Sequence, residues 1–214
     1  QILLQDNVNR FLDDNSALDR VRTYADGGED ADIWAGLAEL GIPALLIPEA
    51  QGGIGLQPLD AAIVAECLGS HIAPTPFLES AVMAPTALVA SGGDHDELLA
   101  EIAAGTKRIG IAFGEAIKRR NNAGVTVKDG RMSGTSMYAF DAEANAYLVA
   151  DQNQHIYLVR ADDPGLKRSH LATVDKTRRT VELNYDNVTA DLVSDDASVF
   201  TSTVDIGRMA LDAD

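Results

Sequence analysis

The spacing of apolar residues changes once along this chain, near residue 107. Before that point, apolar residues recur every three or four positions, which is the period of an amphipathic helix. In residues 30–41 the predicted apolar face consists of Ile33, Trp34, Leu37 and Leu40. We place the N-terminal cap of this helix at Asp30 or Asp32, and Gly41 just beyond its last turn. The first part of the chain is therefore predicted to be helical.

Four more helices follow from the same period. Residues 3–12 form one, and residues 58–70 form another that ends at Gly69. Its predicted face consists of Ala62, Ile63, Glu66 and Cys67. Residues 77–93 form a helix that Pro85 kinks or interrupts, and residues 94–105 form one from an aspartate cap to Gly105.

After residue 107 the period shortens to two, which predicts strands. The strand segments are residues 107–115, 124–134, 145–161, 177–188 and 190–195. The turn Lys128-Asp129-Gly130 predicts a hairpin within the second of them. A helical pattern returns in residues 198–214, with Val199, Thr203, Ile206 and Ala210 on one face. It stops at Asp214 without a cap, so we expect further sequence beyond it.

Helices followed by strands predict an α+β fold. We expect an N-terminal all-α helical domain at residues 1–106 and an antiparallel, β-barrel-like middle domain at residues 107–197. Residues 198–214 are expected to begin a C-terminal helical domain.

The glycine-rich segment Gln51-Gly52-Gly53-Ile54-Gly55 raises the question of a phosphate-binding loop. It does not match the spacing G-x-G-x-x-G, and it lacks the Lys-Ser/Thr pair of a P-loop. The interpretation from local physics is a turn between two packed elements, in which Gly52 and Gly53 supply positive φ angles.

Composition narrows the classes of partner. The 214 residues carry a formal net charge of −16, which argues against nucleic acid and anionic membranes as partners. The single cysteine, Cys67, suits a reducing cytoplasm, and neither a signal peptide nor a bilayer-spanning apolar run is predicted.

His95 stands among acidic residues, which favours a helix N-terminus over a metal site, so no metal is predicted.

Several motifs together resemble the acyl-CoA dehydrogenase family. They are the stretch WAGLAELGIPALLIPEAQGGIG at residues 34–55, ECLG at 66–69, PTPF at 74–77, LLAEIAAGTKRIGIAFGE at 98–115 and GRMSGTSMYAFDAEANAYLVA at 130–150. Each motif alone is weak, but they occur in the family's order over nearly the whole chain. The resemblance does not extend through the family's third, C-terminal helical domain, of which residues 198–214 are expected to be the first part.

This resemblance implies an activity and its partners. Family members bind FAD and oxidise an acyl-CoA thioester to the 2,3-enoyl-CoA, passing electrons to an electron-transfer flavoprotein. A homo- or hetero-oligomer is implied as well. The catalytic glutamate belongs to the missing domain, so we assign no catalytic base here. Glu49 and Glu115 belong to motifs that shape loops, and Glu66 lies in a helix.

The resemblance also implies which residues face the flavin. They are Phe113, Gly114, Tyr138, Ala139 and Phe140. Tyr138 fits the family's aromatic position, whereas Gly114 and Phe140 replace residues that carry a hydroxyl. Each lost hydroxyl removes a hydrogen bond to the flavin, which weakens binding by about 1 kcal/mol. Backbone N–H groups of Phe113, Gly114 or Phe140 remain as donors. For Tyr138 and Phe140, two apart in a strand and so on one face, core packing is the alternative to flavin contact.

Two basic clusters leave phosphate binding and a solvated surface as alternatives. They are Lys118-Arg119-Arg120 and Lys176-Arg178-Arg179.

Three functions remain open from the sequence. The first is an active FAD-dependent acyl-CoA dehydrogenase or a subunit of one, in fatty acid or steroid catabolism. The second is a non-catalytic partner subunit with a degenerate flavin site, which completes another chain's site. The third is an unrelated helical-plus-β ligand-binding module.

Overall fold

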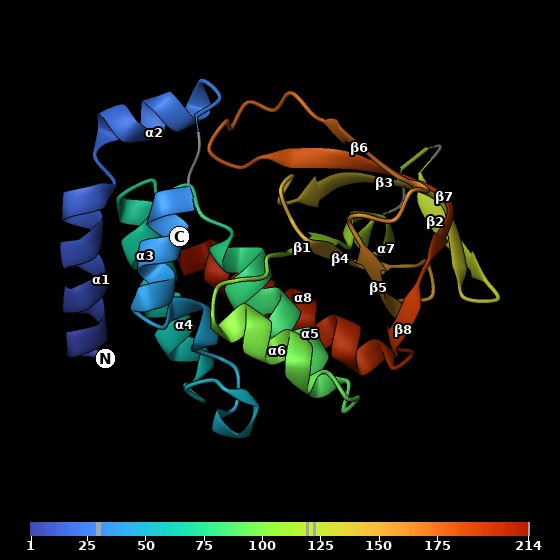
Figure 1. Ribbon diagram of the computed structural model, residues 1–214, viewed down its shortest axis with the longest axis horizontal. Helices are drawn as coiled ribbons and strands as arrows, with labels where there is room; N and C mark the ends of the chain where they lie inside the picture. The colour runs from blue at the N-terminus through green and yellow to red at the C-terminus, as the bar shows by residue number, and fades with distance from the viewer. Residues whose placement is uncertain (29–30, 119, 122, 214) are drawn as a thin grey trace.

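The computed structural model describes residues 1–28, 31–118, 120–121 and 123–213. Helices occupy the first half of the chain (Figure 1). They are α1 (Ile2–Asn15), α2 (Leu18–Ala25), α3 (Ala31–Glu39), the 3-10 turns η1 (Ile42–Ala44) and η2 (Glu49–Gln51), α4 (Pro58–Ser70), the π-helix η3 (Phe77–Met83), α5 (Ala84–Ala90) and α6 (Asp96–Ala103).

In the described residues of the second half, eight strands build one sheet. They are β1 (Ile109–Ala112), β2 (Gly124–Lys128), β3 (Arg131–Phe140), β4 (Ala146–Ala150), β5 (Ile156–Arg160), β6 (Leu166–His170), β7 (Thr180–Thr189) and β8 (Asp191–Ser194). The short helix α7 (Gly114–Ile117) follows β1, and α8 (Ala197–Ala213) ends the chain. The predicted α+β order of helices and then strands is confirmed.

The sheet is mixed and open, which refines the antiparallel, barrel-like prediction. Its order is β6-β7-β3-β1-β4-β5-β8, with β2 paired to β3, and β1 runs parallel to β4. The path of the chain between β1 and β4 explains why these two strands are parallel. The chain reverses direction after β3, which is antiparallel to β1, and then crosses to the other side of β1. In the described residues β6 and β8 end the two edges, so the sheet does not close.

One face of the sheet packs on the helices, and α8 returns to them. In Figure 1, α8 (red) leaves β8 and runs back among α4, α5 and η3, with which it is in contact. The face predicted for residues 198–214 is confirmed in part, since Val199, Thr203 and Ala210 are buried. Gly207 allows this close approach, because a Cβ there would lie 2.8 Å from the sulfur of Met83. The division into three domains remains a prediction.

The glycine-rich segment is a turn, as predicted. Every backbone N–H from Gly52 to Leu56 donates to a carbonyl of residues 44–49, so none points outward to hold a phosphate. Gly52 has a φ of 84° and Gly55 a φ of 68°. The prediction for Gly53 is wrong in its reason. Its φ is not positive, and glycine is required because a Cβ would lie 1.9 Å from the carbonyl oxygen of Ile47.

Some local predictions need correction. In α4 the buried residues are Ala61, Val64, Ala65, Cys67 and Leu68, whereas Glu66 is exposed. The predicted face was therefore rotated, because small alanines on several sides of α4 blur the period. Helix α6 has His95 as its N-cap without a side-chain hydrogen bond, so the predicted aspartate cap is wrong. The caps predicted at Asp30 or Asp32 lie outside the described residues and side chains.

The element around Pro85 is a π-helix that continues as an α-helix. Pro85 lies in the first turn of α5, where its missing N–H costs little. All seven residues of η3 are buried, including the carboxylic acid Glu79. The hairpin turn is confirmed, since Asp129 and Gly130 both have positive φ, at 51° and 71°, and join β2 to β3.

Candidate functional site

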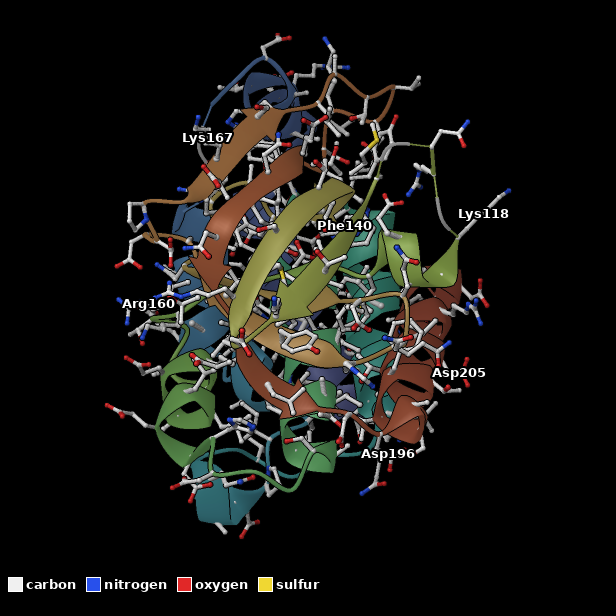
Figure 2. The ribbon with its side chains drawn as sticks, turned by 90° about the vertical axis from the view of Figure 1, so that its right-hand side faces the viewer. Lys118, Phe140, Arg160, Lys167, Asp196 and Asp205 are labelled. Carbon is white, nitrogen blue, oxygen red and sulfur yellow. The ribbon has the colours of Figure 1, made fainter. Side chains whose placement is uncertain are left out.

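The five residues predicted to face a flavin come from two segments that the fold brings together. Phe113 and Gly114 lie where β1 passes into α7, and Tyr138 to Phe140 end β3. Strand β1 pairs with β3 through Ile111 and Phe140, and α7 is in contact with β3. Figure 2 shows this side of the molecule, with Phe140 near its middle and Lys118 at its edge, beyond α7.

Two of the five side chains are buried in the interior. Phe113 is 2% exposed, and its ring lies 5.2 Å from the ring of Phe200 on α8, measured between centroids. Ala139 is fully buried in the core of the sheet. These two positions therefore offer only backbone groups to a ligand.

Tyr138 and Phe140 have different environments. Tyr138 is 45% exposed, whereas Phe140 is half-buried against the helical core. The alternation on which their predicted shared face depends is interrupted by a bulge between Ser136 and Ala139. Within it Tyr138 has a φ of 58°, which is rare for an aromatic residue. The bulge turns the Tyr138 side chain outward.

Glu115 connects the two segments. Its side chain is 2% exposed, and Oε1 accepts hydrogen bonds from Nη1 of Arg120 at 3.0 Å and from the N–H of Met137 at 3.3 Å. Oε2 accepts the backbone N–H of Arg120 at 3.0 Å. Glu115 thus shapes a loop, as its motif predicts, and ties that loop to the bulge beside Tyr138.

Arg120 lies between the two predicted contacts. Its Cζ is 5.1 Å from the centroid of the Tyr138 ring, within the range of a cation–π contact. Its Nη1 is 3.1 Å from the point that a Cβ on Gly114 would occupy. Of the same predicted cluster, Lys118 is exposed, and Arg119 lies outside the described residues.

The second basic cluster joins the sheet to the helices. The guanidinium of Arg179 lies 4.1 Å from the ring centroid of Tyr24 and donates to Glu143 at 2.7 Å and to the carbonyls of Tyr24 and Gly28. These contacts explain Arg179 without a phosphate.

Sequence reasoning missed a group of ionisable side chains, most of them buried, that lies close to Phe140. Asp141 accepts two hydrogen bonds from Arg108, at 2.9 and 2.8 Å, and lines a small cavity with Phe140 and Glu79. Burial, and after it the negative charge of Asp141, raise the pKa of Glu79 to about 8. A polar residue amid the apolar run of residues 77–84 was the available signal.

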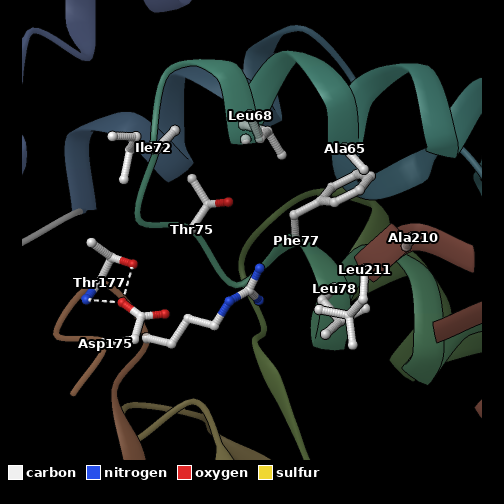
Figure 3. A pocket seen from close by; sticks show the side chains of 13 residues that line it. Ala65, Leu68, Ile72, Thr75, Phe77, Leu78, Asp175, Thr177, Ala210 and Leu211 are labelled. Carbon is white, nitrogen blue, oxygen red and sulfur yellow. Dashed lines mark hydrogen bonds between the residues drawn. The ribbon is translucent and has the colours of Figure 1, made fainter. Parts of the chain in front are cut away.

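A separate cavity of about 220 Å³ opens between α4, η3 and the end of α8 (Figure 3). Leu68, Phe77 and Leu211 supply apolar walls, and Asp175 and Thr177 lie on the opposite side, joined by two hydrogen bonds of 2.8 and 2.6 Å. None of the five predicted flavin contacts lines it. Sequence reasoning missed it because its walls come from segments far apart in the chain.

Two further findings concern metal binding and bilayer-spanning helices. Among the described residues, no group of three His, Cys, Asp or Glu side chains is arranged to hold a metal ion. Over the same part of the chain, no helix has both the length and the apolar character needed to cross a bilayer.

Comparison with known proteins agrees with these motifs and this fold. The profile of the acyl-CoA dehydrogenase N-terminal domain matches residues 1–106. Acyl-CoA dehydrogenase FadE27 of Mycobacterium tuberculosis is 32% identical over 151 residues, which cover 67% of this chain and 40% of FadE27. The chain belongs to the acyl-CoA dehydrogenase family. It spans well under two thirds of that relative's length.

Solved structures of the family superpose over almost the whole chain. The Tcur3481-Tcur3483 steroid ACAD variant has a TM-score of 0.85 at 25% identity, covering 99% of this chain and 61% of that one. The ChsE4-ChsE5 complex from Mycobacterium tuberculosis has a TM-score of 0.84 at 24% identity, covering 98% and 60%. This acyl-CoA dehydrogenase chain therefore has the family's helical and sheet parts in their usual arrangement.

Gly114, Tyr138 and Phe140, as the fold arranges them, do not fit an isoalloxazine. Gly114 and Phe140 offer no hydroxyl, and a guanidinium lies over the one exposed ring. A flavin on Tyr138 would have to displace Arg120 from a buried carboxylate.

Proposed function

We propose that this chain is a subunit of a heteromeric, FAD-dependent acyl-CoA dehydrogenase in which another chain holds the flavin. The assembly would oxidise an acyl-CoA thioester to the 2,3-enoyl-CoA in the cytoplasm and pass electrons to an electron-transfer flavoprotein. In this assembly our chain supplies a folded partner surface and no redox centre.

The observation that carries the proposal is the position of Arg120. It fills the space between Gly114 and Tyr138 and is held there by buried Glu115. The absence of hydroxyls at positions 114 and 140 supports the same conclusion. The similarity to the Tcur3481-Tcur3483 steroid ACAD, whose name joins two chains, supports a heteromeric assembly and an acyl-CoA of the steroid-catabolic class.

A second candidate, an active subunit with its own flavin, is favoured by the exposed ring of Tyr138. A single purification separates the two candidates. The 214-residue chain is purified alone with FAD in every buffer, and its flavin content is measured from the visible absorbance after removal of free FAD.

We expect a colourless protein with less than about one flavin per ten chains. A yellow chain with one flavin per chain, bleached by an acyl-CoA, would overturn the proposal in favour of the second candidate. Co-expression with another acyl-CoA dehydrogenase-like chain that gives a yellow complex, with all the flavin on that other chain, is the supporting result.

A further inference from the structure

We infer that Arg120 is a built-in cover for the Tyr138 ring, so that this face accepts a planar aromatic ligand only after the guanidinium leaves. The inference rests on the proposed function in one respect, because that proposal takes this face to correspond to the family's flavin-facing side and to hold no flavin in this chain. It adds a cause: the ring-binding face is present in this chain but is occupied by the chain's own side chain.

The backbone is arranged to present the Tyr138 ring. A non-glycine residue with φ of 58° is unfavourable and persists only when its neighbours impose it. Ser136 and Ala139 are paired with β7 on either side of the bulge, and the N–H of Met137 is held by Glu115. The chain thus maintains a strained residue that leaves an aromatic ring 45% exposed.

The same carboxylate that holds the bulge also holds the cover. Glu115 binds both the backbone N–H and Nη1 of Arg120, so the arginine is fixed at its root and at its tip. Its side chain is nevertheless 41% exposed, whereas that of Glu115 is 2% exposed. The guanidinium can therefore move into solvent without displacing core side chains, but it leaves the buried carboxylate of Glu115 when it does so.

Gly114 and Arg120 are complementary in shape. The guanidinium reaches to 3.1 Å from the position of an absent Cβ, a distance tighter than ordinary van der Waals contact. Any side chain at position 114 would therefore press on the guanidinium. The missing side chain at 114 and the arginine at 120 form one arrangement, in which the cover fits because residue 114 is glycine.

The test uses riboflavin, which has the isoalloxazine ring but no phosphate, so that loss of a positive charge does not itself weaken binding. Riboflavin fluorescence is titrated with the 214-residue chain and its variants. Arg120→Ala should bind at least ~10-fold more tightly than the wild type, since a cation–π contact and an ion pair no longer compete with the ligand. Arg120→Ala combined with Tyr138→Ala should lose that gain.

Arg208→Ala is the matched control. Arg208 lies on α8 with an exposed side chain and an ion pair to Asp205 at 3.4 Å, and its removal should leave riboflavin binding at the wild-type level. Gly114→Ala is a second way to displace the cover without touching Arg120, since its Cβ would lie 3.1 Å from Nη1 and it adds no hydroxyl, and it should raise riboflavin affinity in the same direction. Thermal melting of each variant shows whether it is folded.

The outcomes separate the inference from the proposed function. Folded Arg120→Ala and Gly114→Ala variants that bind riboflavin no better than the wild type would overturn the inference and leave the partner-subunit proposal standing. A wild-type chain that already binds riboflavin as tightly as Arg120→Ala overturns the cover. A wild-type chain that retains stoichiometric FAD on purification overturns both.

Discussion

The carboxylate of Glu115 accepts a hydrogen bond from the backbone N–H of Met137, 22 residues further along the chain, at 3.3 Å. Together with its two bonds to Arg120, this contact fixes α7 against the bulge of β3. Replacing Glu115 by alanine leaves the Met137 N–H without its acceptor and frees Arg120. We expect Glu115→Ala to lower the free energy of unfolding by about 2 kcal/mol.

Urea denaturation followed by circular dichroism measures this loss. Glu66→Ala, which removes an exposed carboxylate from α4, is the control and should change stability by less than about 0.5 kcal/mol. Equal effects of the two substitutions would show that Glu115 does not hold the loop.

Removing Arg108 should lower the free energy of unfolding far more than removing an exposed arginine that also pairs with an aspartate. Arg108 binds both oxygens of Asp141, whose side chain is 1% exposed, whereas Arg160 binds both oxygens of Asp162 with side chains 74% and 70% exposed. Arg108→Ala leaves a buried carboxylate unpaired and should destabilise the fold by about 3 kcal/mol or more. Arg160→Ala should cost about 0–1 kcal/mol. Similar losses in urea denaturation would contradict the burial of this pair.

Glu79 should make stability fall as the pH rises from mildly acidic to mildly basic. Its pKa in the folded protein is about 8, above the ordinary 4.5, because burial and then the charge of Asp141 disfavour ionisation, while Arg178 and Arg108 act in the opposite direction. In this window the folded protein keeps a proton that the unfolded chain releases. The free energy of unfolding therefore decreases by about 1.4 kcal/mol per pH unit from this group and levels off above its folded-state pKa.

Glu79→Gln removes that dependence and should be more stable than the wild type at pH 8. The check is the difference between variant and wild type in urea denaturation at several pH values from 5 to 9, because other carboxylates contribute equally to both. Glu97→Gln, which changes an exposed carboxylate of α6, is the control. A difference that does not change with pH would mean that Glu79 is ionised throughout.

Substitution by alanine should destabilise the fold more at Gly53 than at Gly55. At Gly53 a Cβ would lie 1.9 Å from the carbonyl oxygen of Ile47, so the backbone must shift. Gly53→Ala should cost about 3 kcal/mol or more. At Gly55 the nearest atom would be 3.8 Å away, and only the positive φ of 68° opposes alanine, at about 1 kcal/mol. Thermal unfolding of both variants checks the order, and a costlier Gly55→Ala would contradict it.

The sequence predicted the elements that local patterns encode. The hairpin at Asp129-Gly130 followed from turn chemistry, and the turn at Gly52 from the absence of a phosphate-loop pattern. Helices α2 and α7 and strand β6 were missed, and α7 begins at Gly114, within the strand predicted for residues 107–115. Strand β6 is almost entirely exposed, so it has no apolar alternation, and its pairing with β7 comes from the backbone.

The site could be located from the sequence but not described. The resemblance to the family placed positions 114 and 138 on one flavin-facing side, and the pairing of β1 with β3 brings them together. That a guanidinium fills the space between them was not predictable, since Arg120 read only as part of a basic cluster. Its place depends on Glu115, whose acceptor role needs the bulge of β3 beside it.

By itself the sequence determined the succession of helices and strands and the residue types available at the candidate site, since these depend on periodicity, turns and side-chain chemistry read along the chain. The resemblance of its motifs indicated the family. Only the tertiary structure decided that β1 runs parallel to β4, that Tyr138 points outward under Arg120, and that Glu79 and Asp141 are buried together. The physical reason is that strand pairing, burial and contact between charges depend on which distant segments meet in space.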